Sequence, residues 1–210
     1  MVEWSYLPIL GDYDNYRPIT IERKLSQEPQ IFNDILCLAY KSHKSEKNNQ
    51  NSNEKLAINA YRLLNIWKLV PGYDEKGNMD KNKLNEWFDK SVEIAKENDR
   101  LEVALMSIGH VFFYAKEDQD GFWIDRNIAE ILNRDKNEEV KKGYSTQAFN
   151  LLGVVNVDKE GKVCLKEEEK WRKRADLCQT KYFRFANTLR ELADTFHEQA
   201  EYEKQHYYDV

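Results

Sequence analysis

Helical spacing of apolar residues, with few helix breakers, is the feature that most constrains the fold of this chain. Gly and Pro number only 8 and 4 among 210 residues. Apolar residues recur every three or four positions along most of the sequence. Apolar and polar residues almost never alternate with the two-residue period of a half-buried strand. The sequence therefore predicts an all-α fold, an irregular array of about eight or nine helices packed as helical hairpins.

Two segments depart from this pattern. Residues 154–163 carry Val residues on either side of a turn sequence, which predicts at most one small β-hairpin, or else a plain loop. Residues 42–53 contain no apolar side chain and predict a solvated, mobile loop. We expect a single helical domain over residues 1–210, which can be subdivided into N-terminal helices at 1–53 and a main helical core at 54–210.

The segment from Leu101 to Ala115 is apolar nearly all round and is the candidate centre of the core. The segment from Asp74 to Asp80 resembles a calcium loop, but the third position is Lys76 and the twelfth is Asn85. We therefore expect a turn there, followed by a helix capped by Asp80.

The last predicted helix, from about residue 181 to 206, alternates large and small apolar residues at the 3-4 spacing of a coiled-coil seam: Tyr182, Ala186, Leu189, Ala193, Phe196 and Ala200. Trp171, Ala175 and Cys178 on the preceding helix have matching spacing, so an antiparallel helical hairpin is the favoured interpretation. The alternative is that the seam meets another protein or a second copy of the chain. The candidate partner surface is this seam together with three C-terminal tyrosines, Tyr202, Tyr207 and Tyr208.

Sequence signals for catalysis are weak. The chain lacks a His-Glu-x-x-His motif, a Cys-x-x-Cys motif, a Gly-rich phosphate loop and a Gly-x-Ser-x-Gly elbow. His197 and Glu201 lie one helical turn apart, but no third metal ligand follows at a useful spacing. We predict no catalytic residue, no cofactor and no metal, and we expect His110 to be a buried neutral histidine.

An enzyme with an unrecognised helical active site remains the alternative. Its residues would be His110 paired with Glu102, joined by residues in turns where chemistry often resides: Asp99, Arg100 and Asp120.

Nucleic-acid binding is a further alternative, and the charge of the chain disfavours it. The net charge is -5, which repels phosphate unless a local basic patch overcomes it. Glutamates at 167–169 interrupt the best basic patch: Lys166, Lys170, Arg172, Lys173 and Arg174. A mixed-charge run of this kind is typical of a solvated helix face.

Composition and segment lengths indicate the compartment. No apolar run approaches 18 residues, and the first residues lack the basic and apolar stretches of a secretory signal. The three cysteines, Cys37, Cys164 and Cys178, are widely spaced and predict free thiols in a reducing environment. We expect a cytoplasmic protein with no membrane association.

Several short phrases occur together in a familiar order. They lie at residues 4–8 (WSYLP), 61–67 (YRLLNIW) with 70–72 (VPG), 99–103 (DRLEV), 120–123 (DGFW) and 190–193 (RELA). In this order the chain resembles the C-terminal helical portion of large multidomain bacterial proteins of uncharacterised function. The resemblance implies a bacterial cytoplasmic helical module, linked in some such proteins to NTPases or antiphage defence, and a natural start upstream of Met1.

Together these patterns favour a non-enzymatic helical module for protein–protein interaction or scaffolding. We expect a protein partner or self-association.

Overall fold

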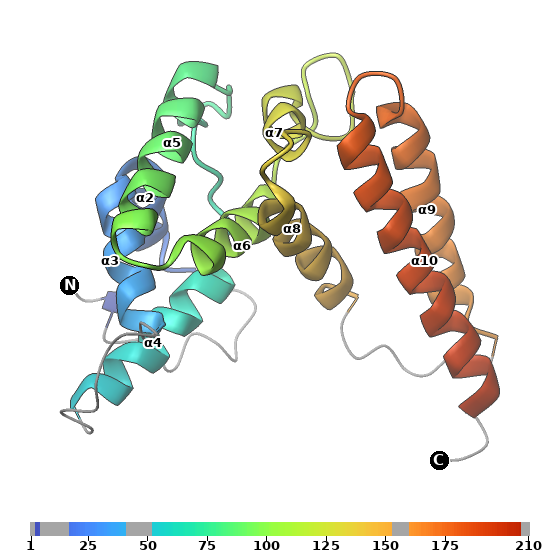
Figure 1. Cartoon of the computed structure of the whole chain (residues 1–210), viewed down its shortest axis with the longest axis horizontal. Helices are drawn as coiled ribbons and strands as arrows, with labels where there is room; N and C mark the ends of the chain where they lie inside the picture. Colours follow the sequence, from blue (N-terminus) through green and yellow to red (C-terminus); the bar gives the residue numbers. More distant parts are fainter. Residues whose placement is uncertain (1–2, 5–16, 41–51, 153–159, 207–210) are drawn as a thin grey trace. The chain divides into compact units, whose positions relative to one another are not determined.

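The computed structural model describes residues 3–4, 17–40, 52–152 and 160–206, and within these ranges the chain is helical (Figure 1). The only β pairing described is an isolated bridge between Tyr73 and Met79. The prediction of an all-α fold with about nine helices is confirmed. The helices in this part of the chain are α2 Ile19–Gln27, α3 Pro29–Ala39, α4 Ser52–Ile66, α5 Lys81–Glu97, α6 Leu101–Phe112, α7 Arg126–Leu132, α8 Glu138–Asn150, α9 Lys162–Cys178 and α10 Phe183–His206.

The predicted hairpin at 154–163 falls largely on residues 153–159, which lie outside the described residues. Lys162 and Val163, which would form its second arm, are instead the first residues of α9. Gly161 precedes them at φ +59°, and a Cβ there would lie 2.8 Å from the carbonyl oxygen of Ala200. A glycine is therefore needed for α9 to begin this close to α10. Of the predicted loop at 42–53, residues 42–51 also lie outside the described residues, and Ser52 already begins α4.

The chain divides into two compact units, residues 1–114 and 115–210. Helices α2 to α6 belong to unit 1, and helices α7 to α10 belong to unit 2. That the whole chain acts as one domain stays a prediction. No helix in the described ranges has both the length and the apolar composition needed to cross a membrane.

Unit 1 is built around an aromatic cluster. The ring of Phe32 on α3 lies 5.5 Å from Trp67 and 5.3 Å from Trp87, centroid to centroid. The indole nitrogen of Trp87 donates to the carbonyl of Leu25 at 3.0 Å, which fastens α5 to α2. Helix α6 is mostly buried, and its Phe112 stacks on Phe88 of α5. The segment predicted to lie in the core therefore does lie in the core of this unit.

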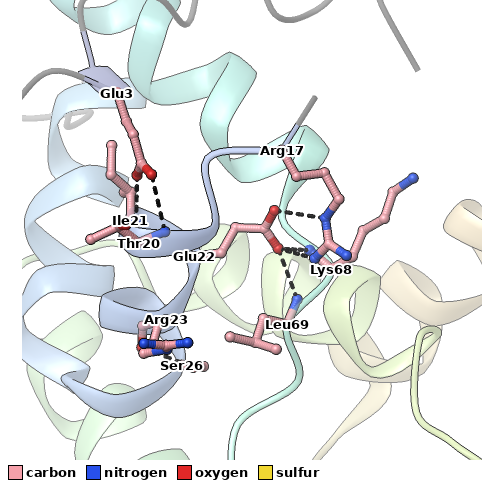
Figure 2. A network of polar contacts seen from close by, with 9 residues as sticks. All are labelled: Glu3, Arg17, Thr20, Ile21, Glu22, Arg23, Ser26, Lys68 and Leu69. Atoms are coloured by element: carbon pink, nitrogen blue, oxygen red, sulfur yellow. Dashed lines mark hydrogen bonds and ion pairs between the residues drawn. The ribbon is translucent and has the colours of Figure 1, made fainter. Parts of the chain in front are cut away.

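A buried carboxylate ties the start of unit 1 to the segment after α4 (Figure 2). Glu22 is fully buried. Its two oxygens accept hydrogen bonds from both Nε and Nη2 of Arg17. Oε2 also accepts from the backbone N–H groups of Lys68 at 2.9 Å and Leu69 at 3.1 Å. Both oxygens of this buried charge therefore have at least one donor, and a buried charge that is hydrogen-bonded in this way costs far less than an unpaired one.

Unit 2 is organised by the α9–α10 hairpin, whose helices run side by side (Figure 1). Asn133, just after α7, accepts hydrogen bonds from the backbone N–H groups of Arg184 and Phe185 and so satisfies the first turn of α10. Tyr144 of α8 meets Phe185 edge to face at 5.3 Å. These contacts hold α7 and α8 against α10.

Candidate functional site

The predicted seam lies inside unit 2. Six of its residues are at most 2% exposed: Tyr182, Ala186, Leu189, Ala193, Phe196 and Ala200. Helix α10 packs chiefly against α9, whose Trp171, Ala175 and Cys178 are also buried. The seam thus serves the internal hairpin and offers no accessible surface, because burying it is what joins the two helices. Tyr202 is 57% exposed, while Tyr207 and Tyr208 lie outside the described residues.

Concave surface is found instead on another side of α10. A groove of about 530 Å³ runs between α8 and α10. Its lining residues are Glu138, Glu139, Lys141, Lys142, Ser145, Thr146, Phe149 and Asn150 of α8, and Thr188, Glu191, Leu192 and Thr195 of α10. Grooves between helices are a frequent place for ligands and peptides to bind. The groove is therefore the candidate functional site.

The charges of the groove do not cancel. Lys141 is only 4% exposed, and its ammonium donates a hydrogen bond to the carboxylate of Glu138, one turn away. Lys142 pairs with Glu139 at 3.7 Å. Glu191 on the facing helix is exposed and forms no ion pair with any described residue. Three glutamates against two lysines leave the groove with a net negative charge, and the uncompensated charge lies on α10.

The remaining polar groups of the groove are mainly hydroxyls. Thr188 donates to the carbonyl of Arg184 at 3.4 Å, and Thr195 donates to the carbonyl of Glu191 at 3.0 Å. Their oxygens keep free lone pairs as acceptors. The hydroxyl of Ser145 is buried and has no partner among the described residues. The lining also includes the apolar side chains of Phe149 and Leu192. The groove therefore offers contacts to a chain that carries both apolar and hydrogen-bond-donating groups.

Within unit 1, the structure does not bring His110 and Glu102, the central pair of the alternative catalytic set, together. Burial lowers the pKa of His110, and its Nε2 has no partner among the described residues. Glu102 lies eight residues earlier on α6, about 12 Å along the helix axis, and is exposed. Arg100 donates to the carbonyl oxygens of Tyr40 and Asn98 and so closes the end of α5. Asp99 occupies the adjoining turn at φ 57°.

Asp120, the last residue of the alternative catalytic set, belongs to unit 2. It bonds Arg126, whose Nε also lies 3.0 Å from Asp118. These pairs hold the loop that precedes α7.

His197 and Glu201, the pair considered above as metal ligands and rejected, each bind a different partner in the structure. His197 Nδ1 lies 2.9 Å from Glu168 on α9, whereas Glu201 pairs with Lys204. Within the described ranges, no three His, Cys, Asp or Glu residues are grouped so that they could hold a metal ion.

Most of the basic patch on α9 is neutralised. Lys170, Arg172 and Lys173 each pair with a glutamate one turn earlier, at 167, 168 and 169. Such pairs are typical of a solvated helix face. Arg174 differs, because its guanidinium packs on aromatic rings. The rings are those of Trp123 and Trp171. Sequence reasoning missed this difference, because Trp123 lies 51 residues earlier in the chain.

Comparison of the chain with protein-family models, with curated proteins and with solved structures finds no match.

Proposed function

We propose that this chain is a non-enzymatic helical interaction module that binds a polypeptide segment of a partner protein in the α8–α10 groove. The observation that carries the proposal is the composition of the groove, which combines the apolar side chains of Phe149 and Leu192 with the exposed carboxylate of Glu191, which forms no ion pair with a described residue. Apolar anchors supply most of the binding energy at protein interfaces, and charges at the edge select the partner.

The same chemistry indicates what the partner carries. A Lys or Arg side chain would find the Glu191 carboxylate unpaired, and an adjacent apolar side chain would cover Phe149 and Leu192. An acidic segment would meet three glutamates and is disfavoured. The partner is therefore a basic amphipathic segment.

The wider setting is also a proposal. The resemblance to the C-terminal portion of large bacterial proteins, some of them linked to defence, supports the proposal that the module forms the C-terminal part of a larger bacterial cytoplasmic protein. Reading the source DNA upstream of Met1 tests this. An uninterrupted reading frame supports it, and a stop codon followed by a ribosome-binding site just before Met1 contradicts it.

The groove itself is tested with labelled peptides and the full chain. We expect an amphipathic Lys/Leu peptide to bind, measured by fluorescence anisotropy, and a matched Glu/Leu peptide to bind at least tenfold more weakly. Glu191→Arg should weaken binding of the basic peptide at least tenfold, because it places a cation where the partner's cation would lie.

The matched control is Glu198→Arg, an exposed glutamate on α10 outside the groove. It makes the same change of charge and should alter binding less than twofold. Equal effects of the two variants would show that only net charge matters, and the groove would then not be the binding site. Sedimentation of the unliganded chain over a range of concentrations tests the alternative that a second copy of the chain occupies the groove.

A further inference from the structure

Arg174 of α9 lies against two tryptophan side chains in unit 2. Its guanidinium carbon is 4.4 Å from the ring centroid of Trp123 and 4.7 Å from that of Trp171. The two rings meet at 84°, with centroids 6.2 Å apart, so they form a corner that holds the guanidinium. Trp171 is itself buried and stacked edge to face on Tyr144. The arginine side chain is therefore fixed by rigid neighbours.

This guanidinium has no anionic partner in the part of the chain that the structure describes. Among the described residues it forms no hydrogen bond and no ion pair. Other arginines of the same unit do pair with carboxylates: Arg126 with Asp118 and Asp120, Arg172 with Glu168 and Asp194, Arg184 with Asp135, and Arg190 with Asp176. Acidic residues outnumber basic ones in this chain, 37 to 32, so the unpaired state of Arg174 does not reflect a shortage of carboxylates.

The unpaired charge has a cost that the aromatic contacts offset only in part. Burial lowers the pKa of Arg174, whereas hydrogen bonds to carboxylates raise the pKa of Arg126 and of Arg172. None of the Arg174 nitrogens is among the buried polar atoms that lack a partner, so its N–H groups reach the surface. A cation held by ring faces, with its donors open, is preorganised for an anion that binds through those donors.

We propose that Arg174 is a binding site for a carboxylate group of a polypeptide, held by the guanidinium fork in the corner formed by Trp123 and Trp171. A planar carboxylate matches the fork with two parallel N–H···O bonds, while the rings exclude water from one side.

The surroundings favour a singly charged anion over a phosphate. The carboxylates of Glu117 and Glu167 act on Arg174 from beyond ion-pair distance. Glu167 is occupied by Lys170 and by the indole N–H of Trp171. A phosphate of nearly two negative charges would be repelled by both glutamates, with a single arginine to compensate. A carboxylate has a single negative charge, so the two glutamates repel it about half as strongly.

NMR titration of the ¹⁵N-labelled full chain tests the site at constant ionic strength. The probes are N-acetylglutamate amide (one side-chain carboxylate), N-acetylalanine (one C-terminal carboxylate), inorganic phosphate and chloride. We expect saturable shifts of the Arg174 Nε–H and of the Trp123 and Trp171 indole N–H signals with at least one carboxylate. The carboxylate probe that binds more tightly shows whether the natural ligand group is a side-chain carboxylate or a C-terminal carboxylate. Phosphate binding at least as tight as both carboxylates, or non-saturating shifts with all four probes, would overturn the proposal.

Two variants complete the test. Arg174→Gln should weaken carboxylate binding at least tenfold, as followed by the indole signals, whereas Arg172→Gln, which removes a nearby arginine that is already paired, should change it less than twofold. If Arg174→Gln fails to fold, Arg174→Lys keeps the charge and removes the fork, and at least fivefold weaker binding is expected. Unchanged binding in the Arg174 variant would refute the site. The proposal does not rest on the groove, so Glu191→Arg should leave these titrations unaltered.

Discussion

Two charged side chains that are withdrawn from solvent, Glu22 in unit 1 and Arg174 in unit 2, differ in how the described residues pair them. In unit 1 the carboxylate of Glu22 is fully buried and receives four hydrogen bonds, from Arg17 and from two backbone N–H groups. In unit 2 the guanidinium of Arg174 is partly buried against two indole rings, and it forms no ion pair with any described carboxylate.

The difference separates a charge that holds the fold from a charge that is available to a ligand. A buried ion whose hydrogen-bonding capacity is filled by its own chain contributes when intact and costs much when a partner is removed. An ion whose donors are left open contributes little to folding, and a ligand can still fill them. Denaturation experiments can distinguish the two cases.

The largest effect is expected from Glu22→Ala. The change leaves Arg17 and the N–H groups of Lys68 and Leu69 without their acceptor inside the fold. We expect the free energy of unfolding to fall by about 3–5 kcal/mol, measured by urea denaturation. Glu86→Ala, at an exposed glutamate of α5, should change it by less than about 0.5 kcal/mol. A loss below about 1 kcal/mol at Glu22 would remove the contrast between the two charges.

A much smaller effect is expected from Arg174→Met. Methionine keeps an unbranched stem and favourable sulfur–aromatic contacts with the two indoles, and it removes the cost of burying an unpaired charge. The free energy of unfolding should change by less than about 1 kcal/mol, because the variant loses the cation–π attraction but also avoids the cost of desolvating a charge, and the two effects nearly balance. A loss above about 2 kcal/mol would make Arg174 a structural charge like Glu22.

The smallest effect is expected at the surface of the α9–α10 hairpin, where Glu168 bonds His197 and Arg172. Burial alone would raise the pKa of Glu168, but these hydrogen bonds outweigh it and lower the pKa. A carboxyl whose pKa is lowered on folding adds stability above its unfolded pKa, and this stability is lost as pH falls through the folded pKa.

Glu168→Gln should therefore cost a few tenths of a kcal/mol near pH 7, and urea denaturation should show this difference disappearing in acid. Glu198→Gln, which removes an exposed carboxylate on α10, is the control and should show no such dependence. A Glu168 effect that does not vary with pH would mean that packing, and not charge, is responsible.

Local pattern was enough to predict most of the helices. The 3-4 spacing from Tyr182 to Ala200 predicted both α10 and its buried face, because periodicity alone decides which side of a helix is apolar. Asp80 was predicted to cap a helix, and its carboxylate does accept from the N–H groups of Asn82 and Lys83. Both signals are contained within a few helical turns of sequence.

The same reasoning could not find the buried carboxylate of unit 1 or the groove of unit 2. Glu22 looks like any polar residue of a short helix, and its backbone donors lie 46 and 47 residues later. Lys141 looks exposed in sequence, yet it is buried along the groove because α10 packs beside α8. No pattern within α8 alone, or within α10 alone, predicts that contact.

The helical class, the extent of most helices and the apolar face of the last one are readable from the sequence, since these follow from propensity and spacing along a single segment. Three features depend on tertiary packing: the C-terminal seam packs against α9, α8 and α10 enclose a groove, and Trp123 and Trp171 hold Arg174. Each of these depends on which distant segments pack together, and that choice is made by the fit of side chains in three dimensions.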